Sequence, residues 1–150
     1  MTTATISSTT PRLAEIARSV AERPEDWLHR VRLRADGRWY ERLRRDDDHE
    51  VWLISWLPGQ ATGFHDHGES EGAFTVVLGS LEEREPGESR TVEVGRSWSF
   101  GRDYVHDVRN SSGAPAVSVH VYSPPLNSMR RYEETDDGLL QVAIEQAEDW

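Results

Sequence analysis

From about Arg38 onward the sequence consists of short apolar runs, each ended by Gly, Pro, Asp or Ser. The runs read WYERLR, EVWLISWL, FTVVLGSLEER, SRTVEVG, SWSF and AVSVHVYS. Strands this short, separated by turn residues, are typical of a β-sandwich or barrel. The sequence has no alternation of strands with helices, which a parallel sheet would require. It therefore predicts a mainly β domain.

The chain is predicted to form one domain, residues 10–132, between two tails. A chain of 150 residues can bury about 70% of its unfolded surface around one core. Residues 1–9 are rich in Thr and Ser and are predicted to be disordered. Residues 10–36 are predicted to be a helical cover, because Thr10-Pro11 and Pro24 each open an apolar pattern at helical spacing. Residues 133–150 form an acidic tail, with an amphipathic helix predicted over 138–147.

Composition excludes several classes of function. The sequence contains no cysteine, so any metal must be held by His, Asp or Glu. The net charge of -10 argues against nucleic acid as a partner and favours a small-molecule ligand. The N-terminus has no basic leader, and no segment approaches the ~20 apolar residues of a membrane span. We expect a cytoplasmic monomer with no membrane partner.

The segment GFHDHGESEGAF contains two histidines separated by one residue. On a strand, His65 and His67 would project to the same side, close enough to share one ion, while Asp66 would point to the other side. Asp66 is therefore expected to make a hydrogen bond in a turn or behind the ligands. The same spacing also occurs in polar loops, so the pair predicts a metal site only together with its context.

That context resembles the two-part signature of the cupin superfamily, a small jelly-roll-like barrel called the double-stranded β-helix. The matching positions around the histidine pair are Gly59, Gly72, Gly79, Gly95, Gly101, Asp103, His106 and Asn110. The resemblance implies that His106 is a third imidazole ligand. Three neutral imidazoles leave adjacent coordination positions open, which allows substrate and O2 to bind at one iron.

Three positions depart from the cupin pattern. Gly101 stands where the signature has Pro, and Asp103 where it has Gly. Gly72 stands where many cupins place a ligating carboxylate. Glu69 or Glu71 could replace that ligand only from a shifted register, so a site of three histidines is the preferred interpretation.

The strand AVSVHVYSPP carries a second polar row. Ser118, His120 and Tyr122 alternate with three valines, so all three face one way. The pattern leaves two alternatives open: the row lines a polar interior, or it faces water while the valines face the core.

With the histidine pair and His106, this strand makes the sequence resemble the cysteine dioxygenase family of iron-dependent thiol dioxygenases, from about Tyr40 to Pro125. The resemblance implies that His65, His67 and His106 bind Fe(II), and that O2 and a small thiol are the substrates. It implies a hydrogen-bonded row of Ser118, His120 and Tyr122 beside the iron. Arg42 would grip the substrate carboxylate, with Tyr40 lining the same pocket. Alternation places Tyr40 and Arg42 on one face without showing that it points inward.

The resemblance leaves the substrate open. L-cysteine, oxidised to cysteine sulfinate, is the expected substrate, because related enzymes for 3-mercaptopropionate tend to have glutamine at the position of Arg42. Another small carboxylate thiol is the alternative in the same class, and a non-catalytic metal-binding cupin is the alternative outside it. Mammalian members have a cysteine, crosslinked to tyrosine, at the position of Gly72. This chain cannot form that crosslink, so Tyr122 is expected to be unmodified.

Overall fold

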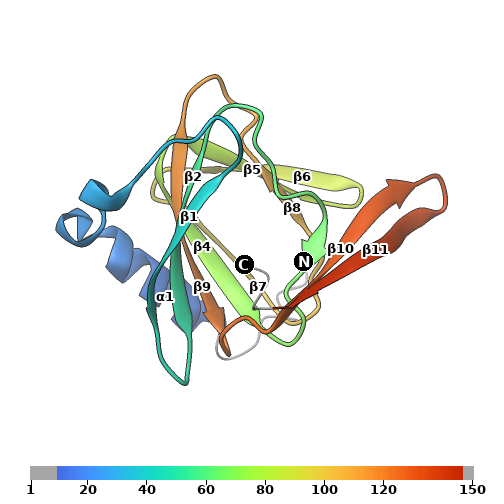
Figure 1. Cartoon of the computed structure of the whole chain (residues 1–150), viewed down its shortest axis with the longest axis horizontal. Helices are drawn as coiled ribbons and strands as arrows, with labels where there is room; N and C mark the ends of the chain where they lie inside the picture. Colours follow the sequence, from blue (N-terminus) through green and yellow to red (C-terminus); the bar gives the residue numbers. More distant parts are fainter. Residues whose placement is uncertain (1–9, 147–150) are drawn as a thin grey trace.

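A computed structural model describes residues 10–146, which form a mainly β structure with one α-helix (Figure 1). The elements are α1 (Thr10–Ala21), the 3-10 turns η2 (Pro24–Asp26) and η3 (Leu28–Arg30), β1 (Trp39–Arg45), β2 (Glu50–Trp56), β3 (His65–Asp66), β4 (Glu71–Leu78), β5 (Ser80–Glu85), β6 (Glu88–Glu93), β7 (Ser97–Phe100), β8 (Asp107–Arg109), β9 (Ala116–Ser123), β10 (Ser128–Thr135) and β11 (Gly138–Gln146). Residues 1–9, predicted to be disordered, lie outside the described residues.

The strands form three antiparallel sheets. The largest has the order β1-β2-β9-β4-β7, and two smaller sheets have the orders β11-β10-β3 and β6-β5-β8 (Figure 1). Every strand pair within them is antiparallel. The predicted mainly β, cupin-type fold is confirmed, although the sheets do not close into one continuous barrel.

Helix α1 covers the outer face of the large sheet, against β4, β7 and β9. Its apolar positions at helical spacing, Leu13 and Ala17, are fully buried against the valines of β9. The prediction of a second helix after Pro24 is wrong, because only η2 and η3 form there. Trp27 is buried in the same core, but Leu28 is 61% exposed.

None of the helices between residues 10 and 146 has the length and apolar character that crossing a bilayer requires.

A second core lies on the inner side of the large sheet and packs it against β5, β6 and β8. Its buried members are Ile54, Trp56, Phe74, Val76, Leu81, Val92, Val108 and Ala116. Both faces of β9 are consequently buried, the valine face under α1 and the polar face inside. Of the two alternatives for this strand, the structure supports the polar interior.

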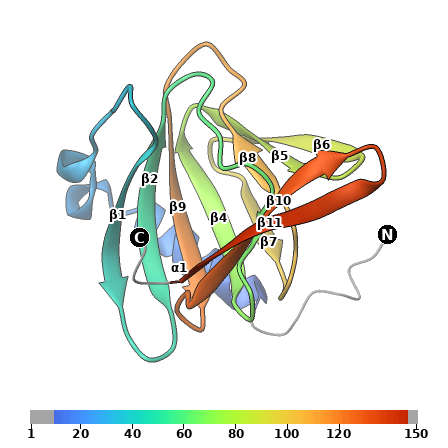
Figure 2. The ribbon, with the colours of Figure 1, turned by 45° about the vertical axis from the view of Figure 1, so that its right-hand side comes forward.

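The predicted C-terminal helix is also wrong where the structure describes it. Residues 128–146 form the hairpin β10–β11, which extends away from the large sheet (Figure 2). Two residues, Asp136 and Asp137, connect the strands, and Gly138 has a φ of 115°. An Asp-Gly pair at this position is a hairpin signal. Leu140, Val142 and Ile144 recur with a period of two, which suits a strand rather than a helix.

Candidate metal centre and active-site pocket

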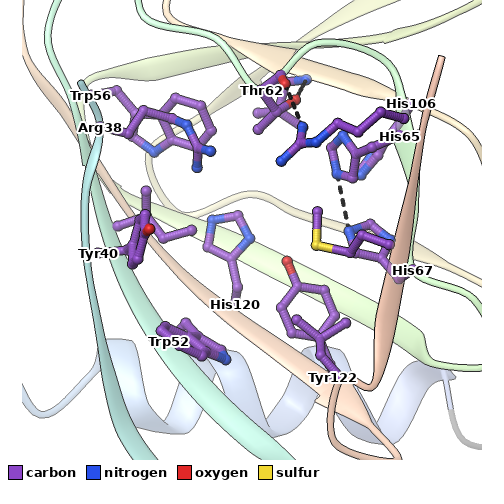
Figure 3. A pocket seen from close by; sticks show the side chains of 15 residues that line it. Arg38, Tyr40, Trp52, Trp56, Thr62, His65, His67, His106, His120 and Tyr122 are labelled. Carbon is purple, nitrogen blue, oxygen red and sulfur yellow. Dashed lines mark hydrogen bonds between the residues drawn. The ribbon is translucent and has the colours of Figure 1, made fainter. Parts of the chain in front are cut away.

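Backbone pairing brings the three predicted histidine ligands together. His65 and His106 form an antiparallel bridge, with N–H to C=O distances of 2.9 and 3.0 Å. His67 follows the short strand β3, and its Nε2 lies 3.1 Å from Nε2 of His65. One ring nitrogen from each of the three lies within 4.8 Å of the others, and all three side chains are buried (Figure 3). The prediction that these residues converge is therefore confirmed.

The hydrogen bonds of two of these imidazoles direct their Nε2 lone pairs inward. His65 donates from Nδ1 to the carbonyl of Gly63 at 2.8 Å, and His106 donates from Nδ1 to Glu83 at 2.8 Å. Burial lowers the pKa of His65 and His67 well below its usual value, and neighbouring imidazoles lower it further. Neutral imidazoles with converging lone pairs are the donor set that a divalent transition metal requires. The arrangement could hold such a metal.

Glu83 stabilises the histidine cluster through a hydrogen bond to His106. Its side chain is fully buried on β5 and accepts hydrogen bonds from His106 and from the Tyr104 hydroxyl, the latter at 2.7 Å. Arg90 forms an ion pair with the other carboxylate oxygen. Burial raises the pKa of Tyr104, and its hydrogen bond to Glu83 raises it further, so the phenol stays protonated. No local pattern predicts this role of Glu83, because it lies between Glu82 and Arg84 in a run of charged residues.

Gly72 occupies a position with no room for a side chain. A Cβ built there would lie 2.4 Å from Cζ of Phe100 and 3.0 Å from Cδ1 of Tyr122. The Phe100 ring stacks on His67, with centroids 4.9 Å apart and planes at 24°. It therefore fills the space that a carboxylate ligand or a crosslinking cysteine at residue 72 would need. The sequence identified Gly72 as a departure but did not reveal the role of Phe100.

Asp66 and Asp103 stabilise the loop around the histidine pair. Asp66 is 1% exposed and accepts hydrogen bonds from the Gly68 amide at 3.0 Å and the Tyr132 hydroxyl at 2.6 Å. It therefore points away from the metal centre, as expected. Asp103 has a φ of 58°, a left-handed conformation that glycine adopts most readily, and it pairs with Arg130 at 2.9 Å. This explains why the cupin signature has glycine at this position.

Two members of the polar row of β9, His120 and Tyr122, line the pocket next to the histidines. Nε1 of Trp56 donates to Oγ of Ser118 at 2.9 Å, and Oγ of Ser118 lies 2.7 Å from Nε2 of His120. The rings of His120 and Tyr122 are nearly parallel, with centroids 6.4 Å apart. Burial lowers the pKa of His120 to about 3, with a further contribution from the charge of Arg38. Burial raises the pKa of Tyr122, so the imidazole and the phenol are both neutral at pH 7.

Two arginines that the sequence analysis did not select, Arg38 and Arg131, line this pocket. Figure 3 shows the three histidines on one wall and Arg38 beside Trp56 on the other. Arg131, on β10, donates from Nη1 to the Thr62 carbonyl at 2.7 Å and pairs with Glu145 at 3.1 Å. The empty space of the pocket, including its open mouth, is about 710 Å³.

The structure separates the two predicted substrate-binding residues of β1. Tyr40 lines the pocket and is 45% exposed at its mouth. Arg42 lies in an adjacent groove, where its Nη1 is 3.6 Å from Glu50 and its guanidinium lies over Trp52 at 5.9 Å. The three histidines and the polar row are thus brought together with Tyr40, and Arg42 is not.

Comparison with solved structures supports the fold. The protein is similar to TT1209 from Thermus thermophilus, with 25% identity and a TM-score of 0.61, over 65% of this chain and 94% of that chain. It is also similar to an uncharacterised protein with a double-stranded β-helix domain from Klebsiella pneumoniae, with 21% identity and a TM-score of 0.59, over 75% of this chain and 90% of that chain. The second likeness shows the fold alone.

Comparison by sequence identifies the family. The chain is 26% identical over 134 residues to cysteine dioxygenase type 1 of Danio rerio, covering 77% of this chain and 66% of that protein. It thus spans slightly less than two thirds of that relative. The family model described as cysteine dioxygenase type I matches residues 8–135, which include the three histidines and the polar row. The chain therefore belongs to the cysteine dioxygenase type I family.

Proposed function

We propose that this protein is an iron-dependent thiol dioxygenase that acts on a small thiol carrying a carboxylate. L-cysteine is the first candidate substrate and 3-mercaptopropionate the alternative. The observation that carries the proposal is the convergence of three buried imidazoles in the same pocket as the Tyr122 phenol. Family membership supports the same reaction class.

The proposed metal ligands are His65, His67 and His106. They fit Fe(II) because their imidazole nitrogens are buried and lie close together, and because Glu83 fixes the orientation of the His106 ring. When bound, iron supplies the redox chemistry that allows a thiol to react with O2. In the reaction, the O–O bond breaks and two S–O bonds form, so that R–SH and O2 give R–SO2H. Sulfur is oxidised and oxygen is reduced without any other reductant.

The polar row is proposed to position the reactants. The raised pKa of Tyr122 keeps its hydroxyl protonated, so it can donate a hydrogen bond to the substrate. Ser118 links Trp56 to His120, which holds the His120 ring in place beside Tyr122. The aromatic walls provided by Trp52 and Trp56 limit the access of water to the reacting groups.

Metal analysis combined with oxygen uptake tests this proposal. Purified protein is expected to contain iron, and adding L-cysteine or 3-mercaptopropionate is expected to start O2 consumption. The residues that line the pocket include no acid, so the amine of cysteine finds no side-chain partner of opposite charge there. Both thiols should therefore be assayed. Stoichiometric zinc, with no thiol-dependent uptake after reconstitution with Fe(II), would contradict the proposal.

A further inference from the structure

Asp107 is a fully buried carboxylate that follows His106 in the sequence. Consecutive side chains of a strand point to opposite faces, so Asp107 faces away from the histidine cluster that His106 joins. Asp107 does not line the pocket, and none of the roles proposed above uses it. A charge buried this deeply requires partners that replace the lost water, and these partners indicate what it does.

The two carboxylate oxygens of Asp107 have different partners. Oδ2 accepts hydrogen bonds from Nη1 of Arg84 at 3.1 Å and from Nε of Arg109 at 2.8 Å, and Nη2 of Arg109 also contacts it. Oδ1 accepts a hydrogen bond from the backbone N–H of Gly63 at 3.0 Å, and Oγ1 of Thr62 lies 3.4 Å from it. The arginines therefore balance the charge, while the other oxygen holds the loop that leads into β3.

Gly63 connects Asp107 to a proposed metal ligand. The Gly63 carbonyl accepts the Nδ1–H of His65 at 2.8 Å, so Nε2 of that ring carries no proton and faces the other histidines. Gly63 has a φ of 77°, in the left-handed region that glycine adopts most readily. The hydrogen bond from its N–H to Asp107 holds the residue in this conformation, and the carbonyl then keeps its direction toward His65.

Two of the three proposed ligands are thus oriented through their Nδ1 atoms. His106 donates to Glu83 directly, and His65 donates to the Gly63 carbonyl, whose residue is held by Asp107. His67 differs, because its Nδ1 is buried and has no hydrogen-bond partner among residues 10–146. The dipeptide His106-Asp107 therefore supplies one ligand and supports a second.

We propose that Asp107 is a positioning residue that fixes the tautomer and orientation of the His65 imidazole through Gly63. The inference rests on the proposed function for the identity of the metal ligands. The position requires a carboxylate, because one oxygen faces two guanidinium groups while the other accepts an amide N–H. The side-chain amide of asparagine would turn an NH2 donor toward one of these partners, which are donors themselves.

NMR of the metal-free protein with 15N-labelled histidine tests the hydrogen bond itself. Two Nδ1–H signals protected from exchange are expected, from His65 and His106, because both donors are buried and bonded. Asp107→Asn should lose the His65 signal and keep the His106 signal. In the same variant, Fe(II) affinity measured under nitrogen by competition with a chelator should fall by about 10- to 100-fold.

Two controls separate this role from a general effect on stability. Arg109→Gln removes partners of Oδ2 and leaves the bond from Gly63 to Oδ1, so it should lower the unfolding midpoint without changing the His65 signal or Fe(II) affinity. Gly63→Ala and Gly59→Ala form a matched pair, because both positions have a positive φ, 77° and 87°, and an added Cβ meets no atom within 4 Å at either. Both should destabilise the fold similarly, but only Gly63→Ala should weaken Fe(II) binding.

Wild-type Fe(II) affinity in both Asp107→Asn and Gly63→Ala would overturn the inference. Equal losses of affinity in Asp107→Asn and Arg109→Gln would also overturn it, since Asp107 would then only stabilise the fold. If Asp107→Asn does not fold, the comparison of Gly63→Ala with Gly59→Ala decides. If the variants behave as predicted but no thiol supports O2 uptake by the wild type, the proposed function fails and the role of Asp107 stands.

Discussion

Substitution of Gly72 by alanine tests the packing around the three histidines. The change adds one Cβ, which would lie 2.4 Å from Cζ and 2.6 Å from Cε1 of Phe100. The ring has little freedom to move away, because it is 6% exposed and contacts His67, His106 and Tyr104. Overpacking of a tight core costs about 1–3 kcal/mol, which lowers the melting temperature of a chain of this size by roughly 2–12 °C.

Thermal and urea unfolding of the metal-free protein measure this cost. Gly113→Ala is the matched control, because Gly113 is exposed and a Cβ there meets no atom within 4 Å. That control should be neutral or stabilising by about 0.4–1 kcal/mol, through reduced freedom of the unfolded chain. The penalty of Gly72→Ala should also shrink in a Phe100→Leu background. Wild-type stability of Gly72→Ala, or strict additivity of the two changes, would refute the reasoning.

Three further predictions concern the histidines. His106→Ala should abolish stoichiometric iron binding, because two imidazoles are too few to retain the ion; iron content equal to wild type would remove His106 from the proposed ligands. Glu83→Gln should weaken iron binding by about 10- to 100-fold in competition with a chelator, because the carboxylate that orients His106 is lost, and an unchanged affinity would contradict that role. His120 is neutral in the fold, with a pKa of about 3, but binds a proton below about pH 6.5 when the chain unfolds. Its contribution to stability is therefore complete above about pH 6.5 and is lost as the pH falls toward 3, by at most about 1.4 kcal/mol per pH unit. Removing it as His120→Asn should flatten the dependence of the unfolding free energy on pH in that window, whereas the exposed control His29→Asn should not; equal slopes in both variants would argue against a neutral buried His120.

The sequence predicted the three histidines of the site better than the arginines that line its pocket. The spacing of His65 and His67 and the match of His106 were sufficient, because backbone pairing of β3 with the residue before β8 is a property of the fold class. Which residues line the rest of the pocket depends on contacts between strands, and the local sequence does not predict these contacts. Alternation places Arg38 and Arg42 on the same face of β1, but the nearby Glu50 carboxylate engages Arg42 and leaves Arg38 in the pocket.

The errors in secondary structure have specific causes. The amphipathic helix predicted over 138–147 is wrong where the structure describes it, because Leu140, Val142 and Ile144 alternate and the Asp137-Gly138 pair marks a hairpin. These side chains are half exposed. The spacing of the apolar residues therefore indicates a strand, whereas their number does not distinguish a strand from a helix. The role of Phe100 had no sequence signal, because its contact with Gly72 depends on the pairing of β7 with β4.

Labelling with 18O2 shows whether the protein transfers both atoms of O2 to the sulfur of a thiol. Fe(II)-loaded protein is incubated with L-cysteine, and separately with 3-mercaptopropionate, under 18O2, and the products are analysed by mass spectrometry. A thiol dioxygenase gives a sulfinate that carries two 18O atoms, with one sulfinate formed for each O2 consumed. Disulfide with peroxide, or a sulfinate whose oxygen comes from water, would contradict the assignment.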